Sequence, residues 1–287
     1  SFAGQEGPLA NEPGFDYMAA AYAGITEMIG ENDRSPSQVS MAVGDSATGI
    51  SAAMAVVVAL LHRERTGEGQ FIDCSLLDTY LQMHEDYIPR VGLRGDAASP
   101  ERSGSQHPNG GPTGIFECGD GSFLQMMIMP YQWPRLLQAI GMPELEKDTR
   151  FNSPQNRRKN KYELQGIIEQ WMAKIGDRQD ILTILKDQRV PVAPVLTLRE
   201  AINHPHAIQR GAIRQIKDPF IGNFPIPGQP PIFSKWSHNN ELRAPLLGEH
   251  NEEILTTICG LDKSEIVALH ENGIINTDPT FLESSPN

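Results

Sequence analysis

The stretch "SMAVGDSATGISAAMAVVVALLHRERTGEGQ", residues 40–70, decides how the first part of the chain folds. From Ile50 onward the apolar positions follow a spacing of three and four with little polar interruption, which predicts a helix that is covered on most sides. The helix should stop at the glycine turn in "RTGEGQ". Asp45 stands at its start, where the helix dipole favours a carboxylate. The residues alone leave two roles for Asp45, which are a helix cap or a group that performs chemistry.

Composition excludes several classes of protein. The 287 residues contain 24 Lys and Arg against 36 Asp and Glu, and the resulting net charge of −12 argues against a nucleic-acid partner. The longest apolar stretch, Ile50 to Leu61, is shorter than the ~20 residues of a membrane-spanning helix. It is therefore expected to be a core helix rather than a membrane anchor. The three cysteines are far apart, form no metal knuckle or disulfide framework, and favour a reducing cytoplasm.

The segments on either side of this stretch indicate an α/β succession. Upstream, "SFAGQEGPLANEPGFD" (1–16) has the pattern of a strand end and a loop, and "YMAAAYAGITEMIG" (17–30) has helical spacing. Downstream, "FIDCSLLD" (71–78) is partly β-prone and "TYLQMHEDYI" (79–88) is helical. The chain begins in mid-phrase without methionine or a signal sequence, so we expect a segment upstream of it.

A second region begins near Gly92 with a long polar loop rich in glycine and proline. It continues with a predicted hairpin, "GIFECGDGSFLQMMI" (114–128), and with helices over 130–141, 160–175 and 178–188, which together indicate a small α+β domain. An extended segment and a helix are expected over 190–211. The segment "FPIPGQPPIFSKW" (224–236) is too rich in proline for a regular element. Two short helices should follow within 244–275.

Phrases along the whole chain carry a family resemblance. They are "GQEGP" with "PGFD", "GDSATG", "ALLHRERTGEGQ", "HPNGGPTGIFECGDG", "LLQAIGMPEL", "DTRFNS", "RVPVAPV" and "APLLGEHNEEIL". In this order and spacing they resemble the class III CoA-transferases of the CaiB/BaiF family, a group that includes formyl-CoA and carnitine CoA-transferases and the α-methylacyl-CoA racemases. Each phrase alone is common, whereas the ordered set is specific.

The resemblance implies an architecture. Residues 1–88 would be the downstream part of a Rossmann-like large domain, 89–195 the small α+β domain, and 196–287 a C-terminal segment that returns to the large domain. The family's N-terminal segment, with the first strands and many contacts to the CoA nucleotide, is not in this sequence, and a separate N-terminal chain would be one explanation. The family forms interlocked dimers, so we expect a cytoplasmic homodimer.

The resemblance also implies a site and a reaction. Asp45 matches the catalytic aspartate, which attacks an acyl-CoA thioester on the way to an aspartyl anhydride and an aspartyl-CoA thioester. The start of the helix would keep this carboxylate ionised and offer N–H groups to anionic intermediates. Gly110 and Gly111 match the loop that shields the intermediate, although Thr113 stands where the family often has tyrosine. Acyl-CoA and a carboxylic acid would be substrates, with no tightly bound cofactor and no metal.

Other interpretations remain open at this stage. Asp45 could act as the general base of a racemase, or the chain could be non-catalytic and bind only a partner chain. "SATG" after Asp45 favours the transferase over the glycine-rich run of racemases. A structural role is favoured for His107 and for the "GEH" pair Glu249 and His250. The sequence does not indicate which carboxylic acid is the substrate.

Overall fold

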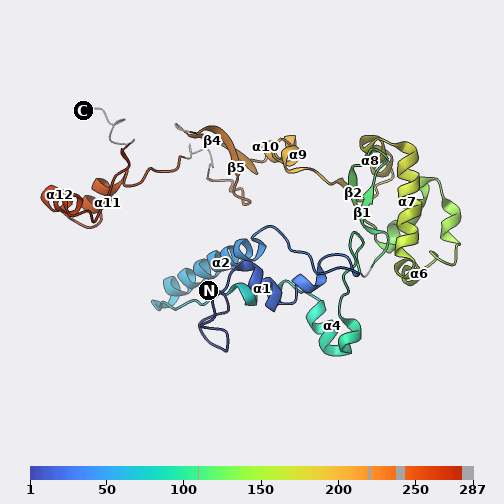
Figure 1. The fold of residues 1–287 in the computed structure, drawn as a ribbon, viewed down its shortest axis with the longest axis horizontal. Coiled ribbons are helices and arrows are strands. Elements are labelled where there is room, and N and C mark those ends of the chain that lie inside the picture. The colour runs from blue at the N-terminus through green and yellow to red at the C-terminus, as the bar shows by residue number, and fades with distance from the viewer. Residues whose placement is uncertain (109, 219–220, 237–242, 280–287) are drawn as a thin grey trace. The chain divides into compact units, whose positions relative to one another are not determined.

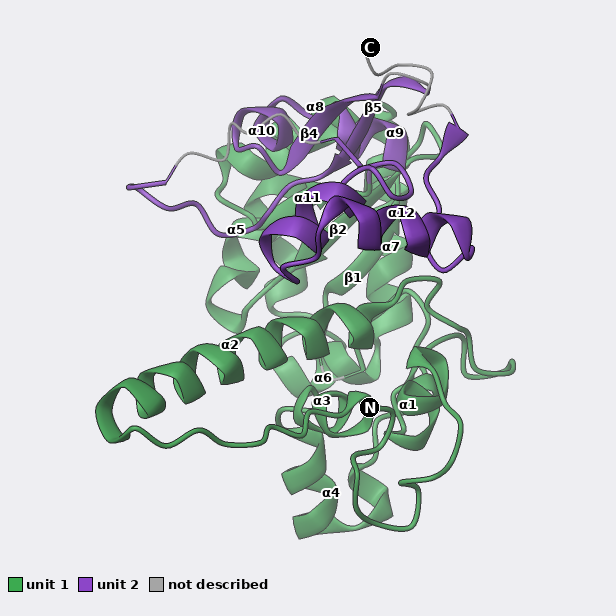
Figure 2. Cartoon of the chain, turned by 90° about the vertical axis from the view of Figure 1, so that its left-hand side faces the viewer, with its two compact units in different colours: residues 1–195 green, residues 196–287 purple. Residues whose placement is uncertain are grey.

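The computed structural model describes residues 1–287 except 109, 219–220, 237–242 and 280–287 (Figure 1). The chain forms two compact units, residues 1–195 and residues 196–287, which are coloured separately in Figure 2. The described residues contain helices and two small antiparallel sheets joined by loops, so the expected mixed α/β class is confirmed. The finer division at residues 88 and 195 and the Rossmann-like sheet stay predictions.

The first part of unit 1 consists of helices. They are α1 (Asp16–Tyr22), α2 (Val43–Thr66), α3 (Leu76–Gln82) and α4 (Tyr87–Arg94), with short 3₁₀ turns η1 (Thr26–Met28) and η2 (Asp96–Ala98). Alanines of α1 and its C-cap pack on Tyr80 of α3 in a small apolar core. Among the described residues no strand precedes Thr113, so the strand end expected within 1–16 and the β-prone 71–78 are not strands here. The two segments nevertheless lie together, since the N–H groups of Leu76 and Leu77 donate to the carbonyls of Ser1 and Phe2.

Helix α2 differs from the expectation of a covered helix. Only Gly44 of its 24 residues is buried, and large apolar side chains such as Ile50, Met54 and Val57 are exposed. The reason is that α1 and α3 are its main neighbours and cover only part of its circumference. By length and composition α2 could cross a membrane, a test that core helices of soluble proteins also pass.

The second part of unit 1 is built on a three-stranded antiparallel sheet in the order β1-β2-β3. Its strands are β1 (Thr113–Glu117), β2 (Phe123–Met127) and β3 (Val192–Pro194). Because side chains alternate along a strand, Phe116, Leu124 and Met126 all point into one fully buried face. The predicted hairpin is confirmed, and Asp120 fixes its turn by accepting the N–H of Ser122 at 2.9 Å.

Helices cover the buried face of this sheet (Figure 1). They are α5 (Trp133–Ile140), α7 (Lys161–Ile175) and α8 (Arg178–Asp187). The short helix α6 (Pro154–Lys159) precedes α7, and the turns η3 (Pro130–Gln132) and η4 (Pro143–Glu146) flank α5. The fully buried residues of α5, α7 and α8 include Leu136, Leu164, Ile168 and Leu185. The three helices predicted for this region from the spacing of apolar residues are confirmed.

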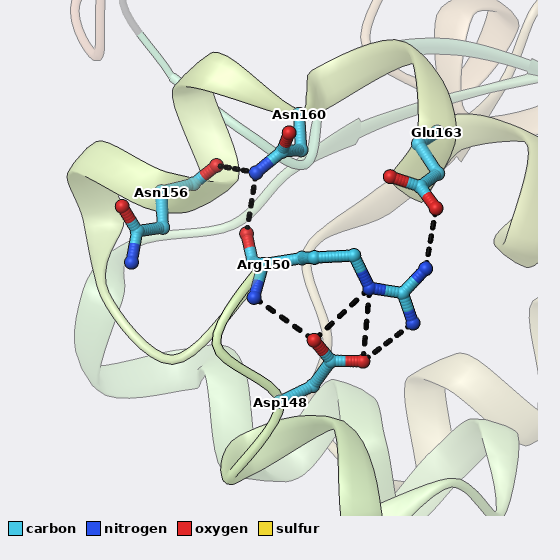
Figure 3. A network of polar contacts seen from close by, with 5 residues as sticks. All are labelled: Asp148, Arg150, Asn156, Asn160 and Glu163. Carbon is cyan, nitrogen blue, oxygen red and sulfur yellow. Dashed lines mark hydrogen bonds and ion pairs between the residues drawn. The ribbon is translucent and has the colours of Figure 1, made fainter.

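A polar network ties the loop before α6 to the start of α7 (Figure 3). Arg150 Nε lies 3.0 and 3.1 Å from the two carboxylate oxygens of Asp148, and the same guanidinium pairs with Glu163. Asn160 Nδ2 donates to the carbonyls of Arg150 and Asn156 at 2.9 and 3.0 Å. The hydrogen bonds from Arg150 hold the pKa of Asp148 below its usual value. The network lies at the surface and fixes the loop rather than a site.

Unit 2 contains short elements. They are α9 (Leu198–Ile202), α10 (Pro205–Gln209), the hairpin of β4 (Ile213–Asp218) and β5 (Gly222–Pro227), α11 (Asn251–Thr257) and α12 (Lys263–Glu271). The expectation that residues 224–236 contain no regular element is wrong at its start, since β5 includes Pro225 and Pro227. Gly228 N donates to Ala212 O at 2.8 Å, and alternation from this pair places both prolines at positions that donate no bond to β4. The two terminal helices are confirmed.

Candidate active site

Asp45 lies in the first turn of α2, as its third residue, and its side chain is exposed. The N-cap position belongs to Ala42, and no side chain of the cap residue bonds to the helix. Asp45 is therefore not the N-cap of α2, and the simple capping role is wrong. Its carboxylate remains available to the surface beside the helix.

Two buried side chains from other helices accept the N–H groups at this helix start. Tyr80 of α3 accepts the N–H of Gly44 at 3.0 Å, and Asp16 of α1 accepts the N–H of Asp45 at 2.9 Å. The Tyr80 hydroxyl in turn donates to the other carboxylate oxygen of Asp16. Asp16 and Tyr80 are only 4% and 5% exposed. The expectation that this helix start offers free N–H groups to an anion is therefore wrong for Gly44 and Asp45.

Close packing holds Tyr80 in this position. A Cβ atom added to Gly44 would lie 2.2 Å from the Tyr80 ring, so a side chain at position 44 would displace the ring. Burial, followed by the hydrogen bond to Asp16, raises the pKa of Tyr80 to about 12. The phenol therefore keeps its proton at neutral pH and remains a donor to Asp16.

A pocket of about 510 Å³ opens beside Asp45. Asp45, Thr48, Gly49 and Ala52 form its α2 wall, because residues three, four and seven positions apart share one face of a helix. The other wall comes from the N-terminal segment, from residues 14–15, and from Cys74 and Leu76 at the start of α3. This pocket is a hollow that is open to the surface rather than an enclosed cavity. Among the described residues, Asp45 is the only one with an acidic side chain that lines this pocket.

A hydroxyl close to Asp45 has no partner of its own. Thr48 Oγ1 is buried and makes no hydrogen bond to the described residues. The backbone carbonyl of Thr48 accepts a weak hydrogen bond from Cys74 Sγ at 3.8 Å. Thr48 and Cys74 both line the pocket beside Asp45.

The glycines of the predicted shielding loop lie elsewhere in unit 1. Gly110 and Gly111 precede β1 and do not line the pocket beside Asp45. A Cβ atom at Gly111 would lie 3.0 Å from the carbonyl oxygen of Arg157, whereas one at Gly110 would have Thr113 Oγ1 as its nearest neighbour at 3.7 Å. The structure does not bring these glycines to Asp45, and their role stays a prediction.

The other residues singled out from the sequence, His107 and Glu249, make contacts with residues close to them in the fold. Desolvation and the charge of Lys161 lower the pKa of the His107 side chain. The backbone N–H of His107 donates to the carbonyl of Thr113 at 2.8 Å. In unit 2 the Glu249 carboxylate accepts the N–H of Leu246 at 2.8 Å and pairs with Arg243, which lowers its pKa. No cluster of residues suited to a metal ion occurs in the described part of the chain.

Sequence reasoning found Asp45 but missed Asp16, Tyr80 and Thr48. Asp16 ends the phrase "PGFD" and stands directly before the helix predicted over residues 17–30, a position at which an acidic residue is ordinary. Tyr80 gives no signal either, because an aromatic residue in an apolar helix face is ordinary core.

The family model and the named relatives that match this chain belong to the same class of protein. The model of "CoA-transferase family III" matches residues 2–251. The chain is 33% identical over 274 residues to the succinyl-CoA:D-citramalate CoA-transferase of Chloroflexus aurantiacus, and the alignment covers 95% of this chain and 67% of that protein. It is 32% identical to the succinyl-CoA:mesaconate CoA-transferase of Haloarcula hispanica, with 85% of this chain and 60% of that protein covered.

A solved structure is similar in fold as well as in sequence. The CAIB/BAIF family protein from Brucella suis aligns with a TM-score of 0.74 and 29% identity over 93% of this chain and 66% of that one. The chain thus spans about two thirds of the length of its relatives or less. The family match extends over most of the chain and includes the helix that carries Asp45, so the chain belongs to CoA-transferase family III.

Proposed function

We propose that the full-length protein transfers CoA from an acyl-CoA to a carboxylic acid, with Asp45 as the nucleophile. The observation that carries the proposal is the Asp45 carboxylate, which lies in the first turn of α2, performs no capping, and faces a pocket of about 510 Å³. Membership of the chain in a CoA-transferase family supports this reaction class.

The reaction proceeds through acyl transfers that balance at each step. The Asp45 carboxylate attacks the thioester carbonyl, which forms a mixed anhydride and releases CoA thiolate. The thiolate attacks the Asp45 carbonyl of the anhydride, so the first carboxylate leaves and an aspartyl-CoA thioester remains. The acceptor carboxylate then attacks this thioester and releases the thiolate again. The thiolate finally attacks the acceptor carbonyl, which yields the new acyl-CoA and restores Asp45.

The surroundings of Asp45 suit a carboxylate nucleophile. The N-terminal end of a helix favours the ionised form, which is the form that attacks. In the described part of the chain, no second acidic side chain lines the pocket and could compete for the thioester. We also propose that the loop with Gly110 and Gly111 covers the pocket during the reaction and excludes water from the anhydride, since glycine allows the backbone to change conformation.

Names of the relatives suggest which substrates to examine. Both relatives described above use succinyl-CoA according to their names, and their acceptors are dicarboxylic acids. We therefore propose a dicarboxylic acid as acceptor and succinyl-CoA as donor. CoA is a substrate here rather than a resident cofactor.

The proposed assembly is a cytoplasmic homodimer. Its large domain would be Rossmann-like, with residues 1–88 as the downstream part, and 196–287 would return to it. The exposed apolar residues of α2 support a larger assembly, because surfaces of this kind are commonly interaction sites. A separate N-terminal chain is the alternative to a single longer polypeptide.

Activity of the Asp45→Asn variant of the full-length protein tests the proposal. Succinyl-CoA would be offered with citramalate, mesaconate, glutarate or oxalate, and the acyl-CoA products would be identified by mass. We expect transfer by the wild type and none by Asp45→Asn, since an amide cannot form the anhydride. Asp33→Asn, at an exposed aspartate in the same region, is the matched control and should keep full activity. Normal turnover by Asp45→Asn would contradict the proposal.

A further inference from the structure

The start of α2 has an unusual arrangement of hydrogen bonds. The first N–H groups of any helix lack partners within the helix, and a local Ser, Thr, Asp or Asn normally accepts one of them. Ala42 at the N-cap has no side-chain acceptor. The acceptors come instead from Tyr80 and Asp16, which lie 36 and 29 residues away from their partners Gly44 and Asp45.

We propose that Asp16 and Tyr80 are positioning residues for Asp45, because they cap α2 from other helices and leave the Asp45 carboxylate free to react. This inference rests on the proposed function. Three segments meet in one chain of hydrogen bonds, from Gly44 N–H to the Tyr80 hydroxyl, from this hydroxyl to Asp16, and from Asp45 N–H to Asp16. The backbone of Asp45 is therefore fixed to Asp16, and the backbone of the preceding Gly44 to Tyr80.

The chemistry of the groups agrees with this role. Both carboxylate oxygens of Asp16 accept a hydrogen bond, one from the Asp45 N–H and one from the Tyr80 hydroxyl. The phenol of Tyr80 donates to one partner and accepts from another at the same time. Because both groups are buried, loss of either partner would leave a polar group without a hydrogen bond. A small shift of the nucleophile would follow, and reaction rates are sensitive to such shifts.

Three variants separate the contributions of the Tyr80 hydroxyl and of the Asp16 carboxylate to the hydrogen bonds at the start of α2. Tyr80→Phe removes only the hydroxyl and keeps the ring that packs on Gly44. Asp16→Asn keeps an oxygen that can accept the N–H of Asp45, whereas Asp16→Ala removes both acceptors. Tyr22→Phe, at a half-exposed tyrosine of α1, is the matched control.

The test uses the full-length protein and two readouts. The first is hydrogen exchange at the amides of Gly44 and Asp45, which reports capping without any activity. The second is the transfer rate per labelled site, with the number of active sites counted as adducts trapped on Asp45. We expect Tyr80→Phe and Asp16→Ala to speed exchange at these amides and to lower kcat about 10- to 100-fold, with KM for the donor little changed. The fraction of chains that can be labelled should stay as in the wild type.

Conservative replacement sharpens the result. We expect Asp16→Asn to recover most of the rate lost in Asp16→Ala, and Tyr22→Phe to match the wild type. Unchanged amide exchange in Tyr80→Phe and Asp16→Ala would overturn the inference while leaving the proposed function intact. A wild-type rate per labelled site, with fewer chains labelled, would also overturn it, because that outcome indicates a purely structural role. Absence of transfer and of labelling in the wild type would instead refute the proposed function, and the positioning role with it.

Discussion

Asp45 is an aspartate in the first turn of a helix that does no capping of its own. The phrase "GDSATG" was enough to place Asp45 at the start of a helix and to name its two possible roles, a helix cap or a reacting group. The choice itself could not be made from the residues, since Asp is common in both roles. It depends on Asp16 and Tyr80, whose contacts with α2 arise from packing between helices distant in sequence.

Gly110 offers a test of the shielding loop at the scale of one residue. Alanine fits at this position, because the nearest atom to its Cβ would be Thr113 Oγ1 at 3.7 Å. It would restrict the backbone, so we expect Gly110→Ala to fold normally but to hydrolyse more acyl-CoA per transfer than the wild type. Product analysis of free acid against new acyl-CoA measures this ratio.

Gly166→Ala is the control for the loop variant. Gly166 lies inside α7 with open space around it, so alanine should stabilise the helix by about 0.5–1 kcal/mol and leave the ratio of hydrolysis to transfer unchanged. An unchanged ratio in Gly110→Ala as well would show that this loop does not shield the intermediate.

Helices α2 and α8 begin in different ways. Asp177 is the N-cap of α8 and accepts the N–H groups of Gln179 and Asp180 at 2.7 and 3.1 Å. Asp45 accepts no such bond and contributes to α2 only through the helix dipole. We expect Asp177→Ala to lower the free energy of unfolding by ~1 kcal/mol. Asp45→Ala should lower it by only a few tenths of that amount, at the lower end of dipole effects.

Urea denaturation of both variants checks this difference. Equal losses of stability would indicate that Asp45 carries a structural role at the helix start, contrary to the hydrogen bonds described above. Asp177→Asn should be close to the wild type, since asparagine caps about as well as aspartate.

Elements with a clear local pattern could be predicted from the sequence. The hairpin of β1 and β2 follows from alternating side chains around a turn centred on Asp120, and α5, α7 and α8 follow from apolar spacing. Strand β5 was missed because proline lowers the expectation of a strand, although a two-stranded hairpin accepts proline wherever it donates no bond to its neighbour. The exposure of α2 was missed for another reason, since periodicity predicts which face is apolar but not what covers it.

At the scale of the whole molecule the exposed apolar residues of α2 are the main feature without an intramolecular explanation. They include Ile50, Met54, Val57 and Leu61, and the chain spans about two thirds of its relatives. Neither fact could be derived from composition, because a chain that is 39% hydrophobic is ordinary for a folded domain.

We expect the full-length protein to be a homodimer in which surfaces of this kind are covered. Light scattering at micromolar concentration should give twice the mass of one chain. A monomer under these conditions would contradict the proposed assembly, and Asp33→Asn, which changes only an exposed charge, should not alter the mass.

Covalent trapping on Asp45 addresses the proposed mechanism most directly. The full-length protein would be incubated with succinyl-CoA, treated with hydroxylamine, digested, and its peptides weighed. Hydroxylamine cleaves an aspartyl anhydride or thioester and leaves a hydroxamate on the aspartate that carried it. We expect this modification on the peptide that contains Asp45, dependent on succinyl-CoA and absent from Asp45→Asn. Active transfer without any adduct on Asp45, or with the adduct on another residue, would contradict the account.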